Sequence, residues 1–309
     1  MTLHKSVLLN EVIEGLKIVD GGIYVDATLG YAGHSSEILK KIPNGFLYGF
    51  DQDDYAVKMS DKKLKEIGTN YTIIHNNFSN LRKELVSREV LGVDGVLFDL
   101  GVSSVQIDEA DRGFSFHKDA KLDMRMDTGS DFSAYNVVNE YSYEDLVRIL
   151  RNYGEEKYAS SIAKNIIKAR LQKDIVTTFE LVDIIKHSMP VKAMREAHPA
   201  RRTFQAIRIE VNHELEVLEV GLRDAIDMLK VGGRVCVISF HSLEDRIVKN
   251  IFKEYSETDS RFKDLPYIPQ EYLPKYKVIS KGIVAGNEEL NDNYRAHSAR
   301  LRIIERNGE

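Results

Sequence analysis

The stretch "GIYVDATLGYAGHS" (residues 22–35) runs from an apolar, β-rich segment into a polar turn with two glycines, and a helical pattern follows it. A strand, a turn and a helix in this order predict the first βα unit of a parallel sheet. Further β-rich runs at residues 46–51, 71–75 and 94–100 alternate with amphipathic segments of helix length. The chain is therefore expected to be an α/β protein with right-handed βαβ connections.

This α/β pattern stops in the middle of the chain and then resumes. The middle segment has helical patterns and no convincing strand, which predicts an all-α insertion. A helix expected over residues 211–229 is followed by three more β-rich runs, at residues 234–240, 276–280 and 300–305. The last two predict an antiparallel ending on a mostly parallel, seven-stranded sheet. The resulting boundaries are residues 1–106 and 210–309 for a discontinuous α/β domain and residues 107–209 for the helical insertion.

Composition and cysteine usage indicate a globular intracellular protein. Of the 309 residues, 43% are hydrophobic and 29% are charged, which suffices for a sizeable core. The single cysteine, Cys236, cannot form an internal disulfide, and its flanks "RVCVISF" predict a buried strand. Because neither a signal-like N-terminus nor a long apolar run is present, we expect a soluble cytoplasmic protein without membrane contact.

Charge is distributed unevenly along the chain. The formal net charge is −5, yet residues 158–209 hold ten Lys or Arg against four Asp or Glu, a balance of +6 that leaves −11 elsewhere. This segment is a candidate polyanion footprint, since arginines bind phosphates and aromatic rings stack on unpaired bases. The alternative is a solvated face whose charges pair with one another. The candidate RNA-binding residues are Arg195, His198, Arg201, Arg202, Phe204 and Arg208.

Polar side chains follow the predicted strands, where ligands of open α/β sheets bind. Gly30 and Gly33 have two residues between them, unlike the G-x-G-x-x-G of dinucleotide-binding proteins. The missing glycine favours S-adenosylmethionine over a dinucleotide, because S-adenosylmethionine has no pyrophosphate that needs close backbone approach. Asp51, 18 residues after Gly33, can accept both hydroxyls of a ribose. An ordinary turn remains the alternative for the glycine pair.

Two further strand ends carry candidate ligand-binding residues. Phe78 can form an apolar wall for an adenine ring, with core packing as the alternative. Asp99 follows an apolar run, where a carboxylate is costly to bury without a partner or a task, although it can also cap the next loop. Asp26 is expected to support the glycine turn. His241 can act as a base, but a hydrogen-bonded structural role is more typical of a lone histidine there.

Several motifs resemble those of one family. They include "HKSVLLNEVIEGL" at residues 4–16, "DATLGYAGHS", "GFDQD", "FDLGVSSVQID", "LDMRMD", "HPARRTFQAIRIEVNHEL" and "NYRAHSARLR". With these motifs the chain resembles the bacterial ribosomal RNA small subunit methyltransferase H family (MraW-type). The resemblance implies a class I, Rossmann-like methyltransferase. It would use S-adenosylmethionine to methylate N4 of a cytidine in the decoding region of 16S rRNA. One departure is Ala32, where the family usually has glycine.

The resemblance also assigns site residues. It places Ala32, Gly33 and His34 at the methionine end of the cofactor, Asp51 on the ribose and Phe78 near the adenine, with Asp99 and Gln106 completing the site. Our hypothesis for catalysis is that Asp99, or the carbonyl of Leu100, accepts a hydrogen bond from the N4 amino group, while Ser103 or Ser104 shapes the pocket. The helical insertion is expected to cover the site and grip rRNA. No metal is expected, since the histidines lack ligand-like spacing.

Alternatives remain open at this point. A nucleotide-dependent dehydrogenase is a second enzyme class, and a noncatalytic ribosome-assembly factor would use the same fold only to bind RNA. The substrate is either naked rRNA or an assembled small ribosomal subunit, and the resemblance favours the subunit. The sequence leaves the oligomeric state open, with a homodimer as one option.

Overall fold

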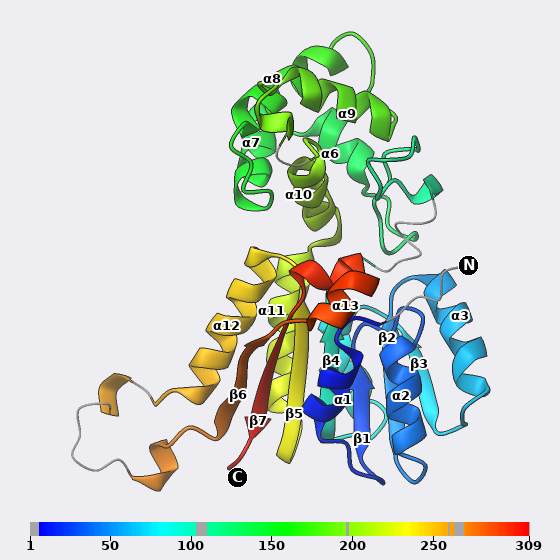
Figure 1. Cartoon of the computed structure of the whole chain (residues 1–309), viewed down its shortest axis with the longest axis vertical. Helices are drawn as coiled ribbons and strands as arrows, with labels where there is room; N and C mark the ends of the chain where they lie inside the picture. Colours follow the sequence, from blue (N-terminus) through cyan, green and yellow to red (C-terminus); the bar gives the residue numbers. More distant parts are fainter. Residues whose placement is uncertain (1–5, 103–109, 196–197, 259, 263–268, 309) are drawn as a thin grey trace. The chain divides into compact units, whose positions relative to one another are not determined.

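The structure is a computed structural model that describes residues 6–102, 110–195, 198–258, 260–262 and 269–308 (Figure 1). The chain folds into two compact units. One, the sheet unit, comprises Met1–Gly101 and Leu215–Glu309, and the other, the helical unit, comprises Val102–Glu214. The chain therefore leaves the sheet unit after its fourth strand and returns to it at the start of a helix.

Seven strands form a single sheet in the order β3-β2-β1-β4-β5-β7-β6. Strands β3, β2, β1, β4 and β5 are parallel, whereas β7 is antiparallel to both β5 and β6. The mostly parallel seven-stranded sheet with an antiparallel ending is thus confirmed. The bounds are β1 (Ile23–Asp26), β2 (Phe46–Asp51), β3 (Tyr71–His75), β4 (Val93–Asp99), β5 (Leu229–Ser239), β6 (Tyr276–Ile283) and β7 (Arg300–Arg306).

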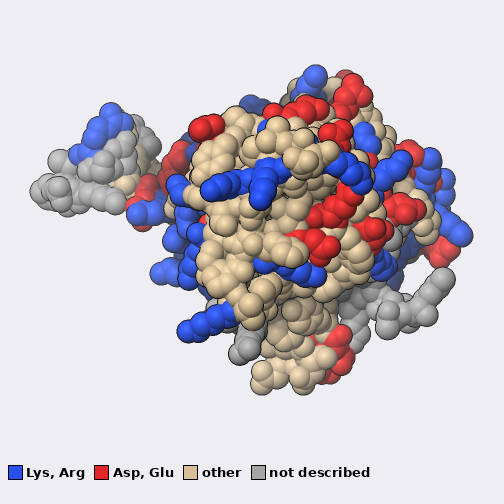
Figure 2. All heavy atoms as spheres, turned by 90° about the horizontal axis from the view of Figure 1, so that it is seen from above, with Lys and Arg blue, Asp and Glu red and all other residues tan. Residues whose placement is uncertain are grey.

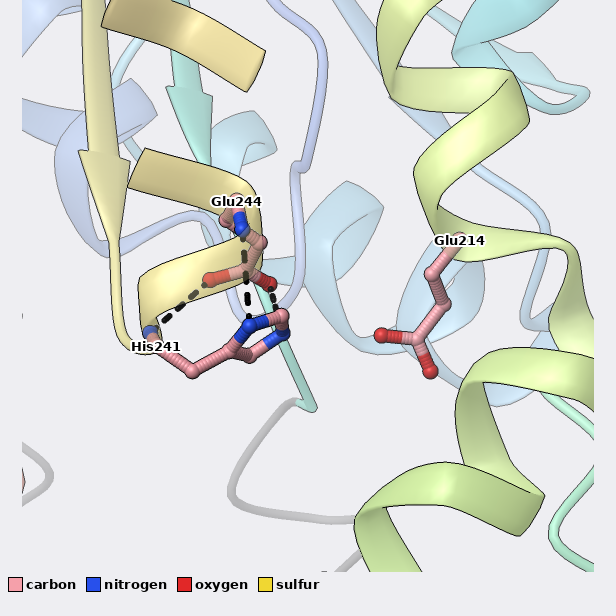
Figure 3. Close-up of side chains that lie close together, drawn as sticks. All are labelled: Glu214, His241 and Glu244. Carbon is pink, nitrogen blue, oxygen red and sulfur yellow. Dashed lines mark hydrogen bonds and ion pairs between the residues drawn. The ribbon is translucent and has the colours of Figure 1, made fainter. Parts of the chain in front are cut away.

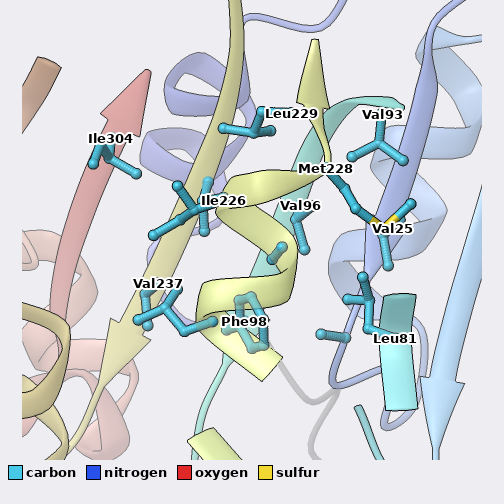
Figure 4. Packing of buried hydrophobic residues seen from close by; sticks show 14 of the residues in the cluster. Val25, Leu81, Val93, Val96, Phe98, Ile226, Met228, Leu229, Val237 and Ile304 are labelled. Carbon is cyan, nitrogen blue, oxygen red and sulfur yellow. The ribbon is translucent and has the colours of Figure 1, made fainter. Parts of the chain in front are cut away.

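Helices cover both faces of this sheet (Figure 1). Successive strand residues point to opposite faces, so Val96 and Phe98 join a core with α4, α11 and α12, while Leu97 joins a second core with α1, α2 and α3. Figure 4 shows the first core, with Ile226 of α11 close to β4 and β5. Cys236 is buried in the second core, as predicted. The helices are α1 (Leu9–Leu16), α2 (Gly33–Lys41), α3 (Asp54–Lys65), α4 (Leu81–Val86), α11 (Glu214–Asp227), α12 (Ser242–Ser256) and α13 (Asn287–Asp292).

The helical unit has one hydrophobic core of its own. Its buried residues come from each of the α-helices described in this unit and include Leu146, Ile162, Leu181 and Phe204. Thr177 and Glu180 form a capping box that starts α9, because each side chain binds the backbone N–H of the other. The helices are α6 (Ala134–Glu140), α7 (Tyr143–Asn152), α8 (Ala159–Arg170), α9 (Thr178–His187) and α10 (Arg201–Asn212). None of the helices described in either unit is both long and apolar enough to cross a membrane.

The helix expected over residues 211–229 is wrong at both ends. His213 adopts a left-handed backbone conformation with φ 50°, so α10 ends at Asn212 and α11 begins at Glu214. α11 then ends at Asp227, and residues from Leu229 onward already belong to β5. Gly232, with φ 84°, lies within this strand. Hydrophobic spacing did not reveal these breaks because apolar residues continue through both of them.

Candidate functional site

The strand order creates a switch point between β1 and β4. The chain proceeds from β1 to β2 and β3 on one side and continues with β4 and β5 on the other. β1 pairs in parallel with β4, with Asp26 opposite Leu97, so the carboxyl ends of the two strands meet. Asp99 ends β4 two residues later. Ligands of open α/β sheets bind outside such a switch point, where the crossover helices diverge.

Asp26 supports the glycine turn, as expected. Its Oδ1 accepts a hydrogen bond from the backbone N–H of Thr28 (3.1 Å), and its Oδ2 accepts one from the Ser35 hydroxyl (2.7 Å). The side chain is buried, and burial raises its pKa to about 6 against the hydrogen bonds that lower it. Asp26 therefore ties β1 to the first turn of α2.

Asp51 places the turn against β2. Its Oδ2 accepts a hydrogen bond from the backbone N–H of Gly30 (2.8 Å), and its Oδ1 accepts one from that of Asp53 (2.9 Å). Burial raises the pKa of Asp51 to about 6, and the neighbouring Asp53 and Asp26 add to the increase. A carboxylate oxygen has two lone pairs, so each oxygen can still accept one hydroxyl. The geometry leaves the expected ribose contact possible, and it stays a prediction.

Ala32 stands in the turn before α2, at the position where the family that the chain resembles usually has glycine. It adopts a left-handed conformation (φ 53°, ψ 39°) as the residue before α2, and its side chain is fully buried in the second core. The methyl group is thus packed inside the protein, away from solvent, and the cost appears as backbone strain. At Gly33, by contrast, a Cβ atom would lie 1.9 Å from the hydroxyl oxygen of Ser6. Any larger residue at position 33 would therefore force the Ser6 hydroxyl to move.

His34 is the second residue of α2, and each of its two ring nitrogens faces another group of the protein. Its Nε2 lies 2.9 Å from the carbonyl oxygen of Val7, and its Nδ1 lies 3.6 Å from Oδ2 of Asp99. The side chain is buried at 4% exposure. His34 therefore links the segment before α1 to the end of β4.

Asp99 is the most perturbed carboxyl group of the site. Its backbone N–H donates to the Thr28 hydroxyl oxygen (2.6 Å), and 27% of its side chain is exposed. Its Oδ1 is buried and has no hydrogen-bond partner among the described residues. Its pKa is raised to about 8, chiefly by burial and also by the charges of Asp26 and Glu244, while the charge of Arg295 lowers it. A pKa of about 8 favours the protonated form of Asp99 at neutral pH, and its Oδ1 has no donor in the described part of the chain.

The remaining predicted cofactor residues are placed as follows. Phe78 lies in the short helix η1 (Phe78–Asn80), half-buried, and its ring meets that of Phe98 edge-on at 5.4 Å. Gly221 of α11 leaves room for it, because a Cβ there would lie 2.6 Å from the Phe78 ring. Phe78 thus packs on the core, and its contact with adenine stays a prediction. Ser103, Ser104 and Gln106 lie outside the described residues.

Leu100 extends β4 beyond Asp99. Its side chain is buried, and its backbone N–H donates to the carbonyl oxygen of Ile238 in β5 (3.0 Å). The next residue, Gly101, has φ 95° and turns the chain away from the sheet. The role predicted for the Leu100 carbonyl stays a prediction.

Comparisons with known proteins bear directly on this site. The MraW methylase family matches residues 1–307. The chain belongs to that family. It is 54% identical over 305 residues to "Ribosomal RNA small subunit methyltransferase H" of Exiguobacterium sibiricum, and 51% identical over 308 residues to the protein of that name in Limosilactobacillus fermentum. Each alignment covers 98% of both chains.

Among solved structures, a rRNA methylase from Streptococcus thermophilus has a TM-score of 0.46 at 11% identity, with 99% of each chain covered. Membership of the MraW methylase family makes the protein a methyltransferase, and its cofactor is S-adenosylmethionine, as the sequence indicated. The site fits this cofactor chemically. S-adenosylmethionine brings ribose hydroxyls for Asp51, whose two carboxylate oxygens each accept one backbone N–H and keep a lone pair.

In this MraW-family chain, His241 has the structural role that the sequence favoured. It precedes α12, and its Nδ1 accepts a hydrogen bond from the backbone N–H of Glu244 (3.4 Å), while Oε2 of Glu244 accepts from the backbone N–H of His241 (3.3 Å) (Figure 3). His241 Nε2 also lies 3.0 Å from Oε1 of Glu244. This capping box starts α12 and buries Glu244. Glu214, also drawn in Figure 3, belongs to the helical unit.

Two of the predicted RNA-contact residues have partners within the helical unit. Phe204 is only 3% exposed and packs in the helical core, with its ring edge-on to Phe116 at 5.6 Å, which favours core packing over base stacking. Arg208 binds Glu214 through two hydrogen bonds of 2.7 and 2.8 Å, which neutralise its charge. Both residues lie on the inner side of α10, which the density of basic residues in the sequence could not reveal.

The other basic residues of this segment are more accessible. Arg201 and Arg202 are exposed, and Arg202 donates to the carbonyl oxygen of Glu155 (2.9 Å). His198 is half-buried and stacks on Phe116 at 4.3 Å, and the side chain of Arg195 lies outside the described part of the chain. Positive and negative side chains are interspersed over the face seen in Figure 2. RNA contact by these residues stays a prediction that must be tested one residue at a time.

The sequence analysis missed two charged neighbours of Asp99. Glu244 follows β5 in "SFHSLED", and Arg295 lies in the short helix η6 (Tyr294–Ser298). Glu244 could have been found from the sequence, because its segment follows a predicted strand. Arg295 could not, since its effect on Asp99 depends on how the segment before β7 is placed in space, which the sequence does not show.

Proposed function

We propose that this protein methylates the exocyclic N4 of a cytidine in the decoding region of 16S rRNA, acting on the small ribosomal subunit. The shared name of the similar proteins supports the ribosomal RNA substrate. Within the chain, the proposal depends on one observation above all. Oδ1 of the partly buried Asp99, at the switch point of the sheet, has no hydrogen-bond donor among the residues that the structure describes.

An exocyclic amino group supplies the donor that this oxygen lacks. The lone pair of cytosine N4 is conjugated with the ring, so the nitrogen is a poor nucleophile until an acceptor draws on its N–H. Asp99 Oδ1 is the acceptor in this proposal. The nitrogen gains one N–C bond, loses one N–H bond and returns to neutrality, while the bond between methyl and sulfur breaks with its electron pair left on sulfur.

When bound, S-adenosylmethionine supplies the methyl group on a positively charged sulfur. The residues of the chain then have to hold the acceptor nitrogen in line with that methyl group, which is the main source of acceleration in such a displacement. The Asp26 and Asp51 carboxylates keep the glycine turn in place through four hydrogen bonds to Thr28, Ser35, Gly30 and Asp53. A rigid turn of this kind fixes the position of its ligand.

The helical unit contributes RNA binding in this proposal. Arg201 and Arg202 are exposed at the start of α10 and are available to phosphates. His198 offers a ring that already stacks on Phe116. A base presented to Asp99 has to be unstacked, which suits a single-stranded or locally opened RNA segment.

The decisive experiment incubates the protein with methyl-labelled S-adenosylmethionine and small ribosomal subunits, or with naked 16S rRNA, and digests the RNA to nucleosides. We expect label in N4-methylcytidine, and more of it from subunits than from naked rRNA. Cofactor binding without label in RNA would favour the assembly-factor alternative, and hydride transfer with a nicotinamide nucleotide would favour the dehydrogenase.

The variant Asp99→Asn tests the acceptor role. Asparagine keeps a side-chain oxygen but cannot take up a proton, so we expect kcat at saturating cofactor and RNA to fall by at least about 100-fold. Full turnover by this variant would contradict the role of the carboxyl group. Calorimetric titration with S-adenosylhomocysteine serves as the control for cofactor binding.

A further inference from the structure

The contact between His34 and Asp99 has no task in the function proposed so far. His34 is buried, although a buried histidine is costly unless both ring nitrogens have partners. One nitrogen faces the Val7 carbonyl and the other faces Oδ2 of Asp99. The side chain of Asp99 is thus approached by His34 at Oδ2, while Oδ1 is the oxygen without a donor.

The Val7 carbonyl determines which nitrogen of His34 carries hydrogen. A carbonyl oxygen only accepts hydrogen bonds, so Nε2, at 2.9 Å from it, is the protonated nitrogen. In a neutral imidazole Nδ1 then has no hydrogen and acts as an acceptor. The group that faces Nδ1 is a carboxyl whose proton is retained at neutral pH. The 3.6 Å separation is long for a hydrogen bond, and such contacts tighten when the substrate is bound.

We infer that His34 and Asp99 form a two-step proton relay, in which His34 acts through Asp99 as the final acceptor of the proton that the substrate amino group loses. This inference rests on the proposed function. The amino proton binds Oδ1 of Asp99 as the proton on Oδ2 moves to Nδ1 of His34. Asp99 is neutral before and after, and the positive charge ends on the imidazolium.

Three charged groups act on Asp99, the member of the His34–Asp99 pair that gives up its proton. Asp26 of β1 and Glu244 of α12 are acidic groups whose charges oppose ionisation of Asp99, so Asp99 stays neutral while the proton passes to His34. Arg295 of η6 acts in the opposite direction and keeps Asp99 from becoming a still weaker acid. Without His34, Asp99 could accept the proton only in its ionised form.

The test uses two replacements of His34 that separate its two contacts. In His34→Gln the amide nitrogen takes the place of Nε2 and can still donate to Val7, but the basic Nδ1 is lost. In His34→Asn an amide takes the place of Nδ1 and faces Asp99, but the contact with Val7 is lost. Neither amide can be protonated. A relay predicts the same change in pH profile for both variants, whereas a structural role predicts that only His34→Asn is impaired.

The expected change follows from the pKa of Asp99. With His34 removed, turnover requires ionised Asp99, whose pKa is about 8, so about a tenth of the molecules are active at pH 7. We expect kcat of both variants to be about 10-fold below the native enzyme at pH 7 and within about 2-fold of it at pH 9. An equal loss of kcat at pH 7 and pH 9 would overturn the relay, and so would an unchanged kcat in His34→Gln. Neither result would contradict the proposed function.

A second readout does not need substrate or cofactor. The ¹⁵N resonances of His34 in the free protein should show hydrogen on Nε2, and their pH titration should have an inflection near pH 8 that Asp99→Asn abolishes. Hydrogen on Nδ1, or an inflection that persists in Asp99→Asn, would refute the relay. If the native protein forms no N4-methylcytidine, the proposed function fails, and this titration still decides whether the two residues share a proton.

Discussion

Replacing Ala32 by glycine tests whether the cofactor turn stores backbone strain. A residue with a Cβ in the left-handed region costs about 1–2 kcal/mol, which Ala32→Gly would release. Against this, the variant loses a fully buried methyl group, worth about 0.8 kcal/mol, and gains freedom in the unfolded chain, worth about 0.5–1 kcal/mol. The contributions nearly cancel. We expect the free energy of unfolding to change by no more than about 0.8 kcal/mol.

The matched control is Ala225→Gly. Ala225 is equally buried but lies inside α11, where glycine loses the methyl contacts and about 1 kcal/mol of helix propensity with no strain to release. Urea unfolding followed by linear extrapolation should therefore show a loss of about 2 kcal/mol for Ala225→Gly. An equal loss for Ala32→Gly would refute the strain argument. Because the backbone of the turn is retained, the Kd for S-adenosylhomocysteine should stay within about 2-fold of the native value.

Three further predictions concern the carboxyl groups, the helical core and the RNA contacts. The folded pKa of Asp26, about 6, lies above the ordinary 3.8, so the folded state holds its proton more tightly and stability falls as pH rises between these values. From pH 5 to 7.5 the native protein should lose about 1.4 kcal/mol relative to Asp26→Asn in urea unfolding, and a constant difference would contradict the buried charge. Phe204→Ala should destabilise the helical unit by about 3–5 kcal/mol in thermal unfolding, and a stable variant with weaker RNA binding would restore the stacking role instead. Arg201→Ala should reduce the slope of log K for RNA against log salt by about 0.7–0.9 without changing cofactor affinity, whereas Lys65→Ala at the last residue of α3, in the sheet unit, should leave the slope unchanged.

Most of the fold could be predicted because its signals are local. Seven β-rich runs and the amphipathic segments between them correspond to the seven strands and the helices that cover them. The break at His213 was missed because a single left-handed residue interrupts a helix without changing its hydrophobic spacing. For a similar reason, the density of arginines in residues 158–209 did not distinguish exposed Arg201 from Arg208, whose charge is neutralised by Glu214.

The sequence by itself determined which residue types stand at the strand ends: a glycine turn and the acids Asp26, Asp51 and Asp99. These follow from chain order, since a parallel strand always delivers its last residue to the same edge of the sheet. Only the tertiary structure decided how these groups act on one another. His34, Glu244 and Arg295 reach Asp99 from three segments far apart in the chain. Burial and charge at that meeting point, which depend on every neighbour in space, make Asp99 a weak acid.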